Sequence, residues 1–265
     1  MSDATTIVVG AGYVGRRVIE KLAVPGTIEL DRTASLDLDT DVALPVALPA
    51  SYCVLYTVPP AIDHEQDLRL VNLLGMLEPA PERFVYISTS GVYGDCGGAL
   101  VDETAAVRPT TARAKRRVEA EHCVQEWATG ENVRLYILRV PGIYGPGRLG
   151  LERIRSSVPI VRESDACPGN RIHVADLVSC CIAALCGDAA GGIYNVGDGD
   201  HRSSTWFSQE VARQAALPLS PETERGGAAR RSNDSRRVAT SRMREQLGVT
   251  PQYPNAADGI RASLL

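Results

Sequence analysis

The sequence predicts an α/β protein built on a doubly wound, parallel β-sheet, and two observations carry this prediction. Short apolar runs recur along the chain, and such runs are the pattern of strands buried on both faces. Segments of helical period separate the runs, and strands that alternate with helices form a parallel sheet. The expected strands are residues 5–9, 26–30, 52–58, 83–89 and 133–140, and the expected helices of this core are 16–23, 62–77 and 110–127.

The first strand is followed directly by three glycines in G-x-G-x-x-G spacing, Gly10, Gly12 and Gly15. The first glycine of such a unit permits a tight turn, the second lets the backbone approach a pyrophosphate, and the third lets the helix pack closely on the strand. We expect the phosphates to sit on the N-terminus of the following helix, beside Tyr13 and Val14. The stretch therefore predicts a dinucleotide-binding Rossmann fold.

The second strand ends at Asp31, twenty-one residues after Gly10. A carboxylate at this spacing accepts hydrogen bonds from the adenosine ribose, and it favours NAD because it would repel the 2′-phosphate of NADP. Arg32 follows directly and offers that phosphate a cation, so NADP stays open as the alternative cofactor. A structural glycine-rich turn with a solvated aspartate is the other interpretation of this stretch.

The connection between the second and third expected strands is unusual. Residues 35–39, S-L-D-L-D, are a candidate short strand whose acidic end would meet the adenine. Residues 41–50 contain Pro45 and Pro49, so we expect the usual crossover helix to be shortened or missing.

Ligands of parallel sheets bind outside the carboxyl ends of the strands, and four loops should converge there. These loops are residues 10–15, 58–60, 89–94 and 141–147. Beyond the glycine loop, the cofactor contacts expected from these strand ends are Thr57, Val58, Pro59 and Pro141.

The periodic order loosens from Arg148 onward. We expect residues 1–147 to form the core and residues 148–265 to form a smaller, mixed lobe, from which about 171–197 return to the core. The segments expected there are helices 149–156, 177–185, 204–215 and 254–265 and strands 158–161 and 191–197.

Composition excludes several classes of protein. The 265 residues are 44% hydrophobic and 23% charged, which is ordinary for a soluble globular protein. No apolar run approaches the roughly 20 residues of a membrane span, and the chain enters its first strand at once, so we expect no membrane contact, no signal peptide and a cytoplasmic location. The seven cysteines form no C-x-x-C pair and the four histidines are scattered, so we expect no metal.

The net charge of −4 is unevenly spread, because residues 225–244 hold seven arginines and one aspartate and the rest of the chain sums to −10. A strongly acidic remainder argues against nucleic-acid binding. We expect a small-molecule substrate instead, and a chain that is a monomer or a homodimer.

Five longer motifs carry a resemblance that covers nearly the whole chain. They are G-A-G-Y-V-G (10–15), Y-I-S-T-S-G-V-Y-G (86–94), L-R-V-P-G-I-Y-G-P-G-R (138–148), R-I-H-V-A-D-L (171–177) and Y-N-V-G-D (194–198). Together they resemble the extended and atypical branches of the short-chain dehydrogenase/reductase superfamily, the NAD-dependent epimerase/dehydratase group.

The resemblance implies a hydroxyl that hydrogen-bonds the reacting oxygen, three residues before the Val of V-Y-G. That position is Thr89, with Ser88 and Ser90 beside it. Hydroxyls that satisfy a local turn are the alternative.

The resemblance also implies a catalytic Tyr-x-x-x-Lys pair on the next helix, and here the chain departs from the pattern. Arg113 stands at the Tyr position and Arg117 at the Lys position; moving the register to Lys115 places Thr111 at the Tyr position. An arginine does not give up its proton near pH 7, so it cannot act as the general acid or base.

Other positions offer substitutes. Asp67 replaces the upstream Asn of the family's tetrad, and Tyr93 and Tyr144 lie on crevice loops where they could donate a proton, although such tyrosines are mostly structural in the family. In the resembling enzymes the C-terminal lobe grips the substrate, often a nucleotide diphosphate sugar, partly through arginine. The candidate substrate contacts are Tyr93, Arg148, Arg171 and Arg236. A solvated basic face is the alternative for the arginines.

Two functions are therefore open. One is an NAD(P)-dependent oxidoreductase, epimerase or dehydratase with a nonstandard active site, acting on a small polar substrate that is possibly phosphorylated or a nucleotide sugar. The other is a non-catalytic NAD(P)-binding sensor or assembly protein.

Overall fold

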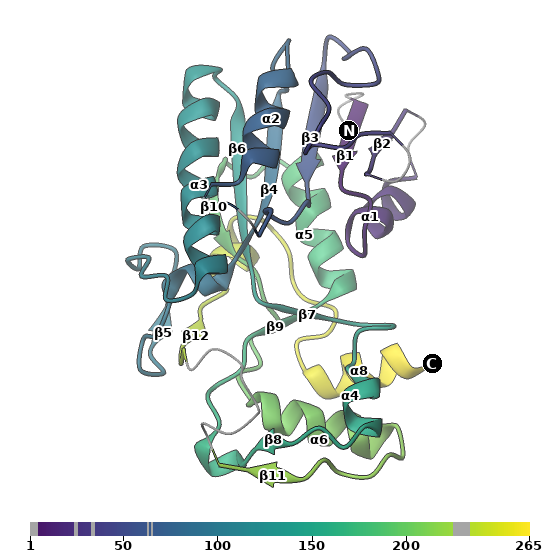
Figure 1. Cartoon of the computed structure of the whole chain (residues 1–265), viewed down its shortest axis with the longest axis vertical. Helices are drawn as coiled ribbons and strands as arrows, with labels where there is room; N and C mark the ends of the chain where they lie inside the picture. Colours follow the sequence, from purple (N-terminus) through teal and green to yellow (C-terminus); the bar gives the residue numbers. More distant parts are fainter. Residues whose placement is uncertain (1–4, 24–25, 33–34, 63, 65, 225–233) are drawn as a thin grey trace.

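The structure, a computed structural model, describes residues 5–23, 26–32, 35–62, 64, 66–224 and 234–265. Its centre is a six-stranded sheet, all parallel, in the order β10-β6-β4-β3-β1-β2 (Figure 1). The strands are β1 (Thr5–Val9), β2 (Ile28–Leu30), β3 (Tyr52–Tyr56), β4 (Arg83–Thr89), β6 (Arg134–Val140) and β10 (Gly192–Asn195). The predicted parallel α/β fold is confirmed.

Helices cover both faces of this sheet, as a doubly wound fold requires. One face packs on α1 (Gly15–Leu22) and α5 (Val174–Cys186), the other on α2 (Leu68–Met76) and α3 (Ala112–Gly130). Alternate residues of each strand serve the two faces, so that in β4 Val85 joins the first core and Phe84 the second.

Side-chain caps fix where two helices begin. α2 begins six residues later than predicted, because the carboxylate of Asp67 accepts a hydrogen bond from the backbone N–H of Leu70 at 3.3 Å. α5 begins at Val174, earlier than predicted, because Nδ1 of His173 accepts from the N–H of Ala175 at 3.2 Å.

The connection from β2 to β3 has neither helix nor strand in its described part, residues 35–51. The absence of a helix agrees with the prediction of a shortened or missing crossover helix, but the strand predicted at residues 35–39 was wrong. Local bonds satisfy this backbone instead: the N–H of Asp37 donates to the carboxylate of Asp41 at 2.7 Å, and the N–H of Asp39 donates to that of Asp37 at 3.1 Å. Leu36 and Leu38 still pack into the core.

The loops that follow β4 and β6 lead into the part of the molecule below the sheet in Figure 1. The remaining elements are η1 (Ser90–Tyr93), β5 (Leu100–Val101), β7 (Gly142–Tyr144), α4 (Leu151–Arg155), β8 (Ile160–Val161), η2 (Glu163–Asp165), β9 (Arg171–His173), α6 (Ser204–Gln214), β11 (Glu222–Thr223), β12 (Arg237–Val238), α7 (Ser241–Glu245) and α8 (Ala256–Leu264). α4, α6 and α8 share a separate apolar core, and α5 and β10 return to the main sheet. The division at residue 148 stays a prediction.

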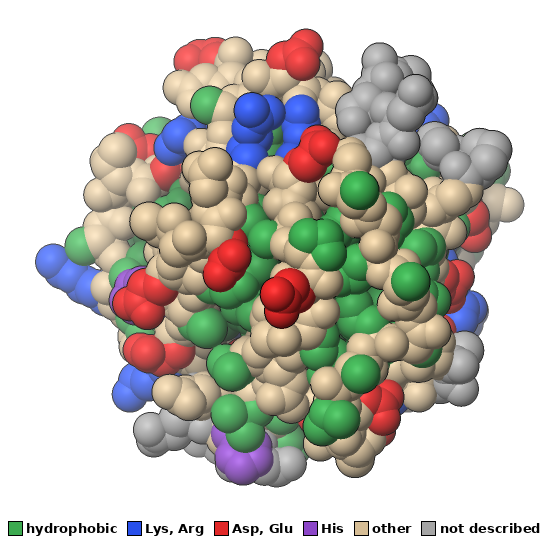
Figure 2. Space-filling view, turned by 90° about the horizontal axis from the view of Figure 1, so that it is seen from above, with side chains coloured by type: hydrophobic (Ala, Val, Ile, Leu, Met, Phe, Trp, Pro, Cys, Tyr) green, Lys and Arg blue, Asp and Glu red, His purple; other side chains and the backbone are tan. Residues whose placement is uncertain are grey.

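The opposite end of the molecule is the amino-terminal edge of the sheet. Figure 2 views it from there and shows hydrophobic side chains in the middle of the face, with acidic side chains among and around them and basic side chains nearer the rim. None of the helices in the described part of the chain combines the length and apolar character of a membrane span.

Candidate functional site

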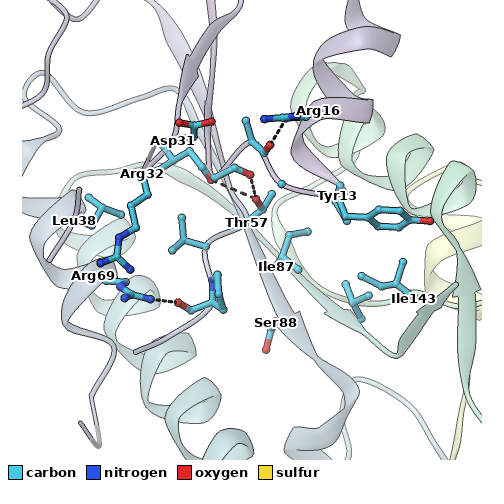
Figure 3. A pocket seen from close by; sticks show the side chains of 18 of the residues that line it. Tyr13, Arg16, Asp31, Arg32, Leu38, Thr57, Arg69, Ile87, Ser88 and Ile143 are labelled. Carbon is cyan, nitrogen blue, oxygen red and sulfur yellow. Dashed lines mark hydrogen bonds between the residues drawn. The ribbon is translucent and has the colours of Figure 1, made fainter. Parts of the chain in front are cut away.

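A cavity of about 640 Å³ opens at the carboxyl ends of the central strands. Its wall comes from the loops that follow β1, β2, β3 and β6, from the end of β4 and from the first two turns of α3 (Figure 3). The strand ends that the sequence placed at one crevice therefore do meet in the structure.

The three glycines of the first loop have three different surroundings. Gly10 has a φ of +94°, which side chains rarely adopt, and the loop turns there. A Cβ on Gly15 would lie 2.5 Å from the carbonyl oxygen of Gly10, so only glycine allows α1 to pack this closely. A Cβ on Gly12 would meet nothing within 4 Å, and Gly12 lines the cavity. The space beside Gly12, near the N-terminus of α1, is therefore open to a ligand.

Tyr13 ties the glycine loop to the loop after β7. Its ring lies between the guanidinium groups of Arg17, at 4.0 Å, and Arg148, at 4.2 Å, and its hydroxyl donates to the carbonyl of Pro146 at 3.0 Å. Burial raises the pKa of Tyr13. Tyr13, Val14 and Arg148 all line the cavity.

The ends of β2 and β3 form the opposite wall. Asp31 and Arg32 line the cavity, as do the apolar side chains of Leu36 and Leu38, which offer a surface to a flat base. The hydroxyl of Thr57 donates to the carbonyl of Gly10 in a short hydrogen bond, so it holds two loops together. The predicted contacts Val58, Pro59 and Pro141 also lie on the lining.

The end of β4 supplies hydroxyl groups to the far wall. Thr89 lines the cavity, and its Oγ1 accepts from the N–H of Gly91 at 3.1 Å, the local turn that was the alternative expectation. Its own proton can still be donated to a ligand. Ser88 lines the cavity too and donates to buried Glu121 in a short bond. Ser90 is buried behind the wall and is not on the lining.

Helix α3 contributes two arginines to the same wall. Arg113 is exposed, and Arg117, one turn on, is 5% exposed. Nη1 of Arg117 donates to the hydroxyl of Tyr86 at 2.8 Å, and its buried Nε has no hydrogen-bond partner among the described residues. The nearby carboxylate of Glu121 pairs instead with Arg139 at 2.7 Å.

A buried network behind this wall holds Tyr93 in the interior. Its hydroxyl donates to Oδ1 of Asn195 at 2.7 Å and accepts from Nη1 of Arg139 at 3.0 Å. Burial raises the pKa of Tyr93. Tyr93 does not line the cavity, which corrects its expected place at the substrate.

Three further expected contacts also lie away from the cavity. Tyr144 is 3% exposed, its ring lies against His173 and Phe207, and burial raises its pKa, so it is not placed to give a proton to a ligand. Nη2 of Arg171 donates to the carbonyl of Ser203 at 3.0 Å. Nη1 of Arg236 donates to the carbonyl of Gly94 at 2.8 Å. None of these three side chains lines the cavity.

Asp67, the expected replacement for the tetrad's Asn, is committed to capping α2. Burial raises its pKa, and it does not line the cavity. Three of the seven arginines in residues 225–244, those at positions 225, 230 and 231, lie outside the described residues, as does the rest of 225–233.

Several lining residues were missed. Arg16 stands directly after Gly15, where the motif itself could have signalled it, but Arg69 lies on α2, far from the glycine loop in sequence. The described lining holds six arginines and two aspartates, Arg16, Arg32, Arg69, Arg113, Arg117, Arg148, Asp31 and Asp37. A cationic cavity in a chain of net charge −4 favours an anionic ligand.

Residues 61–167 match the model of the NAD dependent epimerase/dehydratase family. This match covers less than half of the chain. The family predicted from the motifs is confirmed, and the predicted cofactor, NAD, is the one the family's description names. The match covers β4 and all of α3, so it includes Arg113 and Arg117, which are expected at the Tyr and Lys positions.

The chain also matches curated proteins over part of their length. A dTDP-D-glucose 4,6-dehydratase of Mus musculus is 26% identical over 190 residues, 67% of this chain and 53% of that protein. A dTDP-glucose 4,6-dehydratase of Streptomyces niveus is 25% identical, over 67% of this chain and 55% of that protein. The chain thus spans about half the length of the curated relatives it matches.

Solved structures share the fold over almost the whole chain. A functionally unknown conserved protein from Silicibacter pomeroyi is 27% identical with a TM-score of 0.76, covering 98% of both chains. The UDP-glucose 4-epimerase of Thermus thermophilus, solved in complex with NAD, is 21% identical with a TM-score of 0.76 and the same coverage. RMD from Pseudomonas aeruginosa, complexed with NADPH, is 20% identical with a TM-score of 0.74, covering 98% of this chain and 96% of that one. At these last two identities the likeness concerns the fold alone.

Proposed function

We propose that this protein binds NAD in the cavity and acts as a nicotinamide-dependent oxidoreductase, epimerase or dehydratase on a small anionic substrate. The observation that carries the proposal is the open space beside Gly12, near the N-terminus of α1, with Asp31 at the end of the next strand. N–H groups and the helix dipole favour phosphate at such a place, and a carboxylate after β2 accepts from ribose hydroxyls.

The lining residues fit such a cofactor along the whole cavity. Asp31 and the apolar pair Leu36 and Leu38 would hold the adenosine, and the backbone beside Gly12 would hold the pyrophosphate. The nicotinamide end would then lie toward Thr89. When bound, NAD supplies hydride transfer to or from a substrate carbon.

The chain's own part at that end is to bind and orient the substrate. Thr89 would donate a hydrogen bond to the oxygen on the reacting carbon, while Arg113 and Arg117 would hold a negative charge. Arg117 is suited to this because its buried guanidinium has no carboxylate partner among the described residues to satisfy it. Unlike a Tyr and Lys pair, two arginines cannot move a proton near pH 7.

The place of the lobe arginines favours a small anionic substrate over a nucleotide sugar. Arg171 and Arg236, expected to grip a diphosphate, donate to carbonyls of the protein itself. Arg148, at the cavity, is the lobe arginine that can reach a ligand. The predictions of a cytoplasmic location and of a monomer or homodimer stay predictions.

A non-catalytic NAD sensor is the second candidate, and one observation favours it. Tyr13 is the single tyrosine among the lining residues, which include no lysine, and its hydroxyl is committed to Pro146. A protein whose cavity binds a dinucleotide but offers no titratable proton donor at the reacting end would sense the cofactor without catalysing a reaction.

Calorimetric titration with NADH and NAD tests the shared part of both candidates, and incubation with a panel of small carbonyl acids and phosphorylated sugars separates them. Reduction of a panel member with oxidation of NADH, or conversion of a panel member in the presence of NAD with no net change in the cofactor, supports the enzyme. Binding with no conversion of any panel member favours the sensor. Absence of NADH binding by the folded protein contradicts both.

A further inference from the structure

We propose that Asp39 acts as a built-in substitute for the ribose 2′-phosphate of NADP and so makes the cavity select NAD. The inference rests on the proposed function, because it concerns the adenosine end of the same site. It assigns the selection to a charge pair beyond the end of β2, in addition to Asp31.

Two guanidinium groups meet at this end of the cavity. Arg32 comes from the residue after Asp31, and Arg69 comes from α2; both line the cavity, and Figure 3 shows their guanidinium groups side by side below Leu38. Two cations beside a ribose carboxylate are what a 2′-phosphate would need, so the geometry alone would admit NADP.

Asp39 already forms ion pairs with these two guanidinium groups. Nε and Nη2 of Arg69 donate to the two carboxylate oxygens of Asp39 at 2.7 and 2.6 Å, the parallel pair of bonds in which a guanidinium also holds phosphate. Nη2 of Arg32 lies 3.6 Å from the same carboxylate, and its Nε lies 3.4 Å from Asp37. The hydrogen bond from Arg69 lowers the pKa of Asp39, so the carboxylate stays charged at neutral pH.

The chain holds this carboxylate in place from several sides. Leu36 and Leu38 are buried on either side of Asp37, and the amide of Asn72 on α2 donates to the carbonyl of Leu38 at 3.0 Å. Nη1 of Arg69 also donates to the carbonyl of Pro59 at 3.2 Å, which keeps its guanidinium at the cavity wall. The irregular segment thus brings an exposed carboxylate against two arginines that line the cavity.

The charges explain the selection. The group has one net negative charge, because three carboxylates (Asp31, Asp37 and Asp39) face two guanidinium groups (Arg32 and Arg69). A doubly charged phosphate that enters this group is therefore repelled. NADP would have to displace Asp39 from Arg69. Removing the carboxylate frees the guanidinium fork and makes the group neutral.

The test compares NADH and NADPH binding to the full chain by calorimetry. The wild type should bind NADH more tightly. In Asp39→Asn, NADPH affinity should rise at least tenfold while NADH affinity changes less than threefold. Asp41→Asn is the matched control, because Asp41 lies two residues away, accepts from the N–H of Asp37 and contacts no described arginine; its ratio should match the wild type.

A second variant keeps the proposal open to refutation if Asp39→Asn gains affinity for an unrelated reason. Adding Arg69→Met to Asp39→Asn should remove the gain in NADPH affinity and leave NADH binding in place. An unchanged NADPH/NADH ratio in Asp39→Asn, or a ratio that only Asp31→Asn moves, overturns this inference and leaves the proposed function standing. A wild type that binds neither nucleotide overturns both.

Discussion

The half of the cavity formed by the glycine loop and the half formed by β4 and α3 are built from different kinds of residue. In the glycine-loop half, the lining combines backbone and apolar side chains with two carboxylates, Asp31 and Asp37. In the α3 half, Arg113 and Arg117 stand at the positions where the resemblance implies a Tyr and a Lys. In our proposal the first half binds the cofactor through backbone shape, while the second offers fixed charge and no titrating pair.

If the proposed function is right, cofactor binding and chemistry depend on separate parts of this fold. The glycine-loop half is set by φ angles and close contacts at Gly10 and Gly15, which few sequences satisfy. The α3 half depends on side chains projecting from one helix, and these can change without disturbing the sheet. Variants in each half should therefore fail in different ways.

The largest effect should come from the support of the α3 half. Glu121 and Arg139 are 3% and 4% exposed and pair at 2.7 Å, and removing one partner of such a pair leaves an uncompensated buried charge. Glu121→Ala should lower the free energy of unfolding by about 3–5 kcal/mol in urea titrations. Glu119→Ala, exposed on the same helix, is the control and should cost less than about 0.5 kcal/mol. Equal stabilities of the two variants would mean that the pair does not support this wall.

The next effect concerns the glycine-loop half. Gly12→Val should fold, because a Cβ there meets no atom within 4 Å, yet its side chain fills the space for the pyrophosphate. We expect NADH affinity to fall at least a hundredfold, about 2.7 kcal/mol, with little change in Tm. Gly75→Val, equally open but on α2 away from the cavity, should bind NADH normally. Normal binding by folded Gly12→Val would show that the phosphates sit elsewhere.

Within the α3 half, the hydroxyl and the cations should separate kinetically once a substrate is known. Thr89→Ala removes a hydrogen bond to the reacting oxygen and should lower kcat by about tenfold or more, whereas Thr89→Ser should keep most of the activity. A kcat that survives Thr89→Ala would assign the hydroxyl to its turn with Gly91 alone.

Arg113→Ala should act on binding, because a fixed charge holds substrate and transition state alike. KM should rise several-fold, by roughly 1 kcal/mol, with kcat nearly unchanged. Arg116→Ala is the control, since Arg116 donates to the carbonyls of Ile62 and His64 and does not line the cavity. If KM is unchanged in Arg113→Ala, this side chain does not contact the substrate and the sensor gains support.

The smallest effect is on pH dependence. The wild type should show no ionisation of a Tyr and Lys pair in kcat between pH 6 and 9, because Arg113 and Arg117 stand at those positions. The double variant Arg113→Tyr with Arg117→Lys should gain such an ionisation, seen as a new limb in the profile of kcat against pH. A wild-type profile that already carries this limb would point to another donor.

The two halves also differ in how far the sequence could predict them. The glycine spacing, Asp31 and the strand ends were readable, because a conformational need dictates the residue type. The directions of Tyr144 and Arg171 were not, because they depend on tertiary contacts: both side chains pack against Phe207, and Arg171 also donates to the carbonyl of Ser203. Arg69 carries no local signal at all, since its place depends on a contact with Asp39 thirty residues earlier.

The most direct measurement is a crystal structure of the protein soaked with NADH. We expect the pyrophosphate beside Gly12, the adenosine ribose at Asp31, and Thr89, Arg113 and Arg117 as the side chains nearest to nicotinamide C4. A tyrosine hydroxyl within reach of a substrate that lies against nicotinamide C4 would contradict this expectation. A dinucleotide bound away from the glycine loop would also contradict it.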